Sequence, residues 1–312
     1  MREIHVEAPG LFTTIQDLGR PGYGTLGVSA SGAADPIALR LGNQLVGNPE
    51  NTGALEMTLL GGAFAFSEET LLAITGSDFA PTLDGVAVPL WSSFSVSPRQ
   101  RLHVGSTRTG ARCYLCIQGG IVLKNFLGSA STHILSGLGG LQGRALQKGD
   151  VLTVGPPLPR FAPRKLSSHG IEQLTAREKL RVTEGPQWDW FSESSREFLF
   201  TSGYRVTEEA NRMGLRLDGT KISINSHEPM ITEGVSLGAI QIPPDGQPII
   251  LFVEQQTTGG YPKIANIISA DISSVGQLRP RDEIRFERVT MAQAHRLLLE
   301  QEGMLASEML ET

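Results

Sequence analysis

Short apolar runs separated by turn residues fill the first half of the sequence, and they constrain the fold more than any other feature. Such runs, bounded by glycine and polar residues, are typical of β-strands. The links contain Thr-Gly, Asp-Gly, Gly-Gly and Lys-Gly-Asp, which favour tight turns. The 36 glycines among 312 residues exceed the usual share of about 7%, as many turns require. The expected strands are residues 63–66, 71–74, 87–90, 101–104, 113–117 and 151–154. We therefore predict a mainly β fold with few short helices.

One of these helices is expected over residues 35–45. Asp35 suits the N-cap and Pro36 the first helical position, while Ile37, Leu41 and Leu45 fall on one face. A second helix is expected near the C-terminus, from residue 290 onwards, where apolar and charged residues alternate.

The length predicts two domains, since a typical domain has roughly 150 residues. A proline-rich and basic segment suggests a linker at 161–178, between domains at 1–160 and 179–312. The second half repeats the first weakly, for example in Pro98-Arg99-Gln100-Arg101 and Pro280-Arg281-Asp282-Glu283. A duplication explains this pattern, and chance similarity between short β segments is the alternative. In a duplicated protein, the groove between the copies is a favoured ligand site.

Composition and spacing exclude several classes of function. A net charge of −5 and the absence of basic runs argue against nucleic-acid binding. Cys113 and Cys116 have a C-x-x-C spacing, but a strand places them on opposite faces, so neither a disulfide nor a zinc site is expected. The six histidines show no metal-binding spacing. No apolar stretch of about 20 residues or signal peptide is present, so a cytoplasmic protein without a membrane contact is expected.

The most unusual segment follows an apolar strand and combines hydroxyl groups, glycines and a lysine. Glycines allow a backbone to approach a ligand closely, and a lysine with free N–H groups suits an anion. The spacing is not that of a Walker P-loop. The alternative is a tight turn with Tyr261 packed and Lys263 solvated. The candidate residues are Thr257, Thr258, Gly259, Gly260, Tyr261 and Lys263.

A second polar loop carries Gln16, Asp17 and Arg20. These side chains could line a cleft, where arginine would bind a carboxylate or phosphate; a local ion pair between Asp17 and Arg20 is the alternative. Glu56 lies among apolar residues, so it must be paired or have a raised pKa, and Arg40 is a candidate partner.

Arg212 belongs to the matching polar set of the second half, together with Arg216 and Asp218. A binding role for Arg212 competes with the simpler interpretation that this set is the solvated face of a strand or helix.

Several blocks together resemble the allophanate hydrolase subunit 2 family of biotin-dependent carboxyltransferases. They include Gly10 to Arg20, Ser31 to Asp35, Gly42 to Asn48, Gly139 to Arg144, Gln241 to Pro248 and Thr257 to Lys263. The resemblance covers roughly residues 5 to 287 and implies two cyclophilin-like β-barrel domains. Two positions depart from the family pattern: Arg281 stands where relatives usually carry glycine, and Glu254 where many carry aspartate.

For a chain of this length, the resemblance implies one component of an ATP-dependent 5-oxoprolinase. That enzyme opens 5-oxo-L-proline to L-glutamate, and its other components are a B subunit of similar fold and a lactam-utilisation-type A subunit. The complex would use ATP, the need for Mg²⁺ is left open, and no biotin would be attached to this chain. Two alternatives are a carboxyltransferase component of a biotin-dependent urea carboxylase and a regulatory protein that binds a kinase inhibitor similar to the B subunit.

The reaction implied by the resemblance needs donors for phosphate and for the substrate carboxylate, and this requirement suggests roles for the polar residues singled out above. Lys263, Asp17 and Glu56 are the expected catalytic residues. Substrate or phosphate would be bound by Gln16, Arg20, Arg212, Thr257, Thr258, Gly259, Gly260 and Tyr261.

Overall fold

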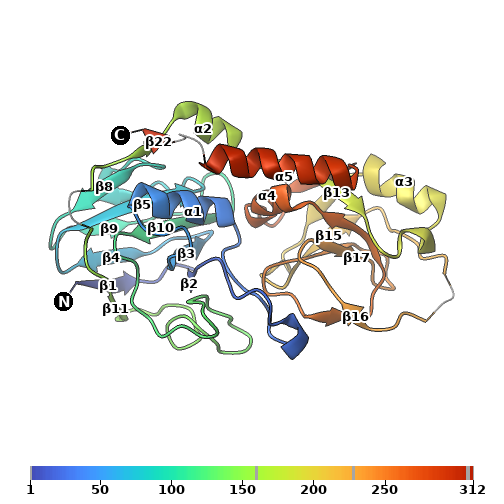
Figure 1. Cartoon of the computed structure of the whole chain (residues 1–312), viewed down its shortest axis with the longest axis horizontal. Helices are drawn as coiled ribbons and strands as arrows, with labels where there is room; N and C mark the ends of the chain where they lie inside the picture. The colour runs from blue at the N-terminus through green and yellow to red at the C-terminus, as the bar shows by residue number, and fades with distance from the viewer. Residues whose placement is uncertain (1, 159–160, 227–228, 307–309, 312) are drawn as a thin grey trace. The chain divides into compact units, whose positions relative to one another are not determined.

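The computed structural model describes residues 2–158, 161–226, 229–306 and 310–311, and it is mainly β, as predicted. Figure 1 shows strands throughout, with few helices among them. The chain forms two compact units. The first comprises Met1–Arg20, Ser31–Thr175 and Leu305–Thr312, and the second comprises Pro21–Ala30 and Ala176–Met304. Each unit therefore contains a short segment from the other half of the sequence.

The first unit has two antiparallel sheets. One has the order β11-β1-β4-β9-β6-β7 and the other β2-β3-β10-β5-β8. Buried side chains of both sheets, such as Ile4, Phe64 and Leu115, form one core cluster. The strands of the first sheet are β1 (Glu3–Ala8), β4 (Ala63–Phe66), β6 (Thr82–Leu83), β7 (Val86–Ala87), β9 (Arg101–His103) and β11 (Val151–Thr153). Those of the second are β2 (Phe12–Gln16), β3 (Ala54–Thr58), β5 (Thr70–Gly76), β8 (Ser93–Val96) and β10 (Arg112–Ile117).

Helix α1 (Pro36–Leu45) lies against β5 and β10 and begins where predicted. The Asp35 carboxylate accepts a hydrogen bond from Ala38 N at 3.0 Å, which caps the first turn. Ile37, Leu41 and Leu45 are buried. The predicted linker contains two elements, β12 (Lys165–Leu166) and α2 (Ser168–Gln173), and both belong to the first unit. Strand β12 pairs with β22 (Leu310–Glu311), near the end of the chain.

The second unit is built on a closed barrel with the order β13-β20-β17-β18-β15-β14-β21. Its strands are β13 (Lys179–Glu184), β14 (Tyr204–Val206), β15 (Gly214–Gly219), β17 (Ala239–Gln241), β18 (Ile249–Leu251), β20 (Lys263–Ile267) and β21 (Glu283–Arg288). A separate ribbon joins β16 (Glu233–Gly234) to β19 (Thr258–Gly259). The helical segments are η1 (Gly24–Leu26), η2 (Trp188–Trp190), α3 (Glu193–Thr201), η3 (Ser269–Asp271), α4 (Ile272–Gly276) and α5 (Met291–Ala306). The last two residues of α5 belong to the first unit. The predicted C-terminal helix is thus confirmed.

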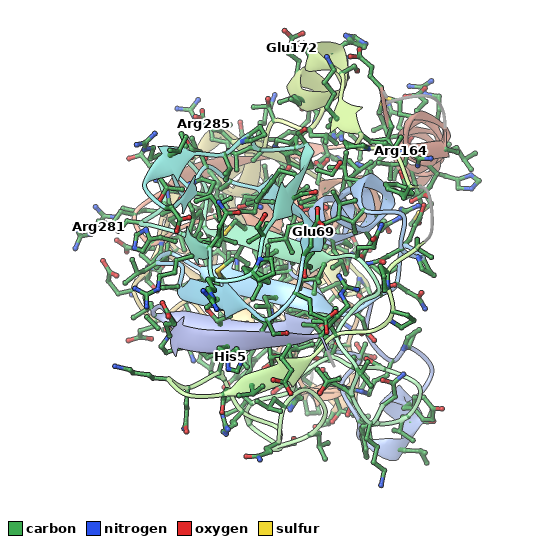
Figure 2. The ribbon with its side chains drawn as sticks, turned by 90° about the vertical axis from the view of Figure 1, so that its left-hand side faces the viewer. His5, Glu69, Arg164, Glu172, Arg281 and Arg285 are labelled. Atoms are coloured by element: carbon green, nitrogen blue, oxygen red, sulfur yellow. The ribbon has the colours of Figure 1, made fainter. Side chains whose placement is uncertain are left out.

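The two segments that suggested a duplication form the same turn. Arg99 and Arg281 both have positive φ angles, of 74° and 77°, in a region that favours glycine. This explains why glycine suits position 281, and Figure 2 shows that the Arg281 side chain points outward, where it pairs with Glu208. A third turn of this kind contains Gly149, with a φ angle of 91°. Because the turn also occurs outside the two similar segments, sharing it does not by itself show a duplication.

Cys113 and Cys116 are both free and buried. Cys113 lies in the core between the sheets and Cys116 in the cluster beneath α1, so the predicted opposite orientation is confirmed. Burial raises the pKa of both thiols. Since the thiolate is the reactive form, we expect Ellman's reagent to label neither cysteine in the native protein and both in guanidinium. Rapid labelling of the native chain would contradict this placement.

Candidate functional site

Lys263 is a buried cation at the start of strand β20. Its Cα is opposite that of Gln241 in β17, beside a register shift between Ile240 and Gln241. Such irregularities redirect side chains and are frequent near active sites. The exposed fraction is 3% for Lys263 and 2% for Gln241. Because opposed residues on antiparallel strands project to the same face, both side chains lie together on one side of the sheet.

Glu233 is the counter-ion of Lys263. The Lys263 Nζ lies 2.5 Å from Glu233 Oε1, and the Glu233 side chain is 44% exposed. Gln187 Nε2 donates to the same oxygen at 2.8 Å, while Gln187 Oε1 accepts from Lys263 N at 3.0 Å. Hydrogen bonds from Lys263 and then from Gln187 lower the pKa of Glu233. The carboxylate is therefore held in its charged form.

Gly259 completes this arrangement. Its Cα is opposite that of Glu233 in the β16–β19 ribbon. A Cβ at position 259 would lie only 2.5 Å from Gln241 Nε2 and 2.9 Å from Gln256 Nε2, so a glycine is needed for β19 to pass over these amides. Gln241, Lys263, Glu233 and Gly259 thus form a closed set of neighbours, which we call the Lys263 ring.

The Lys263 ring contains donors that protein groups do not fully use. Among the residues that the structure describes, neither Gln241 Nε2 nor Lys263 Nζ has a hydrogen-bond partner of good geometry, although Lys263 Nζ is in ion-pair contact with Glu233. A buried donor of this kind normally binds something, because leaving it unsatisfied costs about 1–3 kcal/mol. The ring therefore offers an ammonium group and an amide N–H₂ group to a ligand that carries oxygen atoms.

The predicted residues of the Thr257–Lys263 segment other than Gly259 and Lys263 are exposed or only partly buried. Thr258 and Gly260 are exposed, Thr257 is partly buried, and Tyr261 is 43% exposed. The Thr257 carbonyl accepts from Val235 N at 3.2 Å. The alternative interpretation, with Tyr261 packed and Lys263 solvated, is wrong on both points, because strand pairing places Lys263 inside and Tyr261 outside.

Arg212 and Glu254 form a second buried pair in this unit. Arg212 Nε lies 2.5 Å from Glu254 Oε1, and Glu254 N donates to Arg212 O at 2.8 Å. The solvated face that was the alternative for Arg212 is therefore wrong. The pair connects the segments next to β15 and β18, and the carboxylate at position 254 neutralises the guanidinium.

Asp17 lies in the first unit and fastens a loop to the end of β2. Its carboxylate accepts hydrogen bonds from Gly19 N at 2.7 Å, Ser129 Oγ at 2.6 Å, Ala130 N at 2.6 Å and Ser131 Oγ at 2.5 Å. Four donors occupy this buried group. The geometry is that of a carboxylate that holds a loop in place.

Gln16 and Arg20 are buried around the same loop. Gln16 Nε2 donates to Thr14 Oγ1 at 3.0 Å and to Thr132 O at 3.1 Å. Arg20 donates to the Ser131 carbonyl, and its guanidinium carbon lies 5.6 Å from the centre of the Phe126 ring. The structure thus brings Gln16, Asp17 and Arg20 together around one loop, and their described contacts are internal to the first unit.

Glu56 is paired with Arg112 at 3.6 Å, whereas the predicted partner, Arg40, pairs with Glu50 at 2.7 Å. Arg112 reaches Glu56 because β3 pairs with β10, which carries Arg112 opposite Thr58 and Tyr114 opposite Glu56. Glu56 also accepts from the Tyr114 hydroxyl at 2.7 Å and from Ala34 N at 2.9 Å. Burial and then Glu56 raise the pKa of Tyr114, so its hydroxyl remains a donor.

Sequence reasoning missed Glu233, Gln187 and Gln241. Gln241 was within reach, because it begins a block that resembles the carboxyltransferase family. Glu233 directly precedes a glycine but has no motif around it, and nothing in the local sequence distinguishes Gln187. Their importance comes from strand pairing across the barrel.

A surface groove of about 630 Å³ in the second unit is lined by Arg216 and Asp218 of the predicted polar set, but by none of the predicted catalytic or binding residues. Its charged lining is largely matched in exposed ion pairs, such as Arg205–Asp218 and Arg216–Glu209. Exposed pairs of this kind contribute little energy. Within the described parts of the chain, no cluster of three His, Cys, Asp or Glu side chains could hold a metal ion, and no helix could cross a membrane.

Comparisons with known proteins agree on one family. The model of the "Carboxyltransferase domain, subdomain A and B" matches residues 26–288. The C subunit of the Haemophilus influenzae 5-oxoprolinase is 37% identical over 285 residues, covering 91% of this chain and 90% of that protein. The C subunit of the Escherichia coli 5-oxoprolinase is 36% identical, with 91% of both chains covered.

A solved structure gives the same result. The crystal structure of the Kluyveromyces lactis urea carboxylase matches with a TM-score of 0.92 at 33% identity, over 97% of this chain and 29% of that one. The chain therefore belongs to the family of the carboxyltransferase domain, subdomain A and B.

Proposed function

We propose that this chain is the C subunit of an ATP-dependent 5-oxoprolinase, working in the cytoplasm with a B subunit of similar fold and a lactam-utilisation-type A subunit. The similarity to proteins named as the C subunit of 5-oxoprolinase extends over about nine tenths of both chains. The urea carboxylase, by contrast, is a longer protein of which this chain spans 29%.

The similarity over about nine tenths of both chains is the observation that carries the proposal, and the Lys263 ring provides the place where the substrate would bind. 5-Oxo-L-proline has a carboxylate and a lactam carbonyl, and both need hydrogen-bond donors. Lys263 Nζ would bind an anionic oxygen of the substrate, and Gln241 Nε2 would bind a second oxygen. In the proposed reaction, the terminal phosphoryl group of ATP would be transferred to the lactam oxygen and ADP would leave. Water would then add to the activated ring carbon, and the C–N bond would break to give γ-glutamyl phosphate with a free amine. A second water molecule would release phosphate and L-glutamate.

The first-unit residues have a supporting role in this proposal. Asp17, Gln16 and Arg20 hold the loop at residues 129–132, and Glu56 connects Arg112 to Tyr114. In the second unit, Arg212 and Glu254 neutralise each other. Thr257, Thr258, Gly260 and Tyr261 would form the accessible rim beside Lys263.

A second candidate is the carboxyltransferase component of a biotin-dependent urea carboxylase, which the TM-score of 0.92 favours. The Lys263 ring would then receive a carboxyl group brought by a biotin carrier on another chain. Both candidates need an anion site, so the ring alone does not separate them.

Reconstitution tests the proposal. The chain is mixed with the purified A and B subunits, ATP and 5-oxo-L-proline, and L-glutamate and ADP are measured. We expect glutamate and ADP in equal amounts, and only when all three proteins are present. Full activity of the other two proteins without this chain would contradict the proposal. Urea carboxylation with a biotin carboxylase and its biotinylated carrier would instead establish the second candidate.

A further inference from the structure

The carboxylate of Glu233 has the charge and the position expected of a ligand. We infer that Glu233 is an internal substitute for an anionic ligand: its carboxylate occupies the binding position at Lys263, and a small carboxylate ligand displaces it. This inference rests on the proposed function in so far as Lys263 is taken as the anion-binding group. It adds a role for Glu233 and a mode of binding.

The exposures of the two partners differ greatly. Lys263 is 3% exposed, while the Glu233 side chain is 44% exposed. A buried ammonium group needs a counter-charge, since an unpaired charge in the interior is costly. That counter-charge comes from a residue in contact with solvent. An anion from solvent would therefore approach Lys263 at the place where Glu233 lies. It would neutralise the ammonium group in place of the Glu233 carboxylate.

The support of Glu233 is short. Strand β16 has two residues and pairs with the two residues of β19, outside the closed barrel. Short ribbons of this kind are marginally stable by themselves. Moving Glu233 aside therefore leaves the barrel hydrogen bonds intact, including the pairing of Lys263 with Gln241.

Glu233 also uses the site incompletely. Its Oε1 receives both Lys263 Nζ and Gln187 Nε2, whereas Gln241 Nε2 has no partner among the described residues. In this inference a free carboxylate, which is not tethered to β16, would place one oxygen on Lys263 and the other on Gln241, whose Cα atoms are opposite each other. The unused amide thus favours a ligand with two oxygens over the internal one.

Acetate is the appropriate probe, since it has the carboxylate and nothing else. Binding to the full chain is measured at pH 7 by NMR titration of the Gln side-chain amides. Removing the competing carboxylate in Glu233→Gln should tighten acetate binding by about tenfold or more, because the fraction of molecules with a vacant Lys263 rises. Lys263→Met should abolish the response in either background. Glu233→Ala provides a second test that does not depend on the Gln variant folding.

Glu208→Gln is the matched control, because Glu208 is an exposed glutamate of the same unit that pairs with Arg281. We expect this variant to bind acetate as the wild type does. Equal or weaker acetate binding in both Glu233 variants, with thermal unfolding unchanged, would overturn the inference and leave Glu233 as a structural counter-ion.

The same titration with 5-oxo-L-proline separates the two proposals. Tighter binding of both ligands to the Glu233 variants supports both. Tighter acetate binding without any 5-oxo-L-proline binding would support displacement of Glu233 and count against 5-oxoproline as the ligand of this chain.

Discussion

Replacing Lys263 with methionine is expected to lower the turnover of the reconstituted enzyme by about 100-fold or more, because losing one preorganised donor to a developing charge has an effect of that size. Methionine keeps most of the volume of the side chain but loses the ammonium group. The partner left behind, Glu233, is 44% exposed and can be hydrated, so the barrel should stay folded. Steady-state rates of glutamate formation, with circular dichroism as a check on folding, measure the effect.

The control for this prediction is Lys221→Met, which removes an exposed lysine of the same unit. Its turnover should match that of the wild type. If Lys263→Met retains more than a tenth of the activity in an intact complex, Lys263 is not the group that stabilises the reacting anion.

Replacing Asp17 with alanine is expected to destabilise the first unit by about 3 kcal/mol, because buried donors lose the charged acceptor that satisfies them. Two of these donors are the backbone N–H groups of Gly19 and Ala130, which cannot turn away towards other acceptors as easily as the serine hydroxyls can. Urea unfolding followed by tryptophan fluorescence and circular dichroism should show a transition at lower urea concentration. A chain with two units requires both signals, since its unfolding need not be a single step.

Glu69→Ala is the control for Asp17→Ala, because Glu69 is an exposed carboxylate residue of the first unit (Figure 2). Its unfolding midpoint should be unchanged. If Asp17→Ala keeps full stability but loses activity, Asp17 takes part in the reaction and is not mainly a support for the loop.

For Arg20 too, a role in supporting the loop has to be distinguished from a role in binding a ligand. Its guanidinium is buried against Phe126 and donates to Ser131 O. Loss of turnover in Arg20→Ala would therefore reflect a disturbed loop as readily as a lost ligand contact. Lys263 is the better test of the anion site, because its charge can be removed without leaving a buried carboxylate.

Features that depend on neighbouring residues could be predicted from the sequence. Short apolar runs bounded by turn residues predicted several strands, such as those at residues 63–66, in β4, and 113–117, in β10, whereas the run at 87–90 is a strand only at its first residue. The capping of α1 by Asp35 followed from the preference of the first turn for a side-chain acceptor. The opposite orientation of Cys113 and Cys116 followed from strand geometry alone, and the glycines of the Thr257–Lys263 segment marked a place where the backbone passes close to other groups.

The contacts between residues far apart in the sequence became visible only in the folded chain. Gln187 and Lys263 are 76 residues apart, and Asp17 and Ser129 are 112 apart, yet each pair is joined by a hydrogen bond. Closure of the barrel places β13 and β17 on either side of β20, and the register of β17 brings Gln241 opposite Lys263. Strand order and register are set by the packing of the whole core, so no window of sequence contains them. For this reason Lys263 could be singled out from its segment, but its partners Glu233, Gln187 and Gln241 could not.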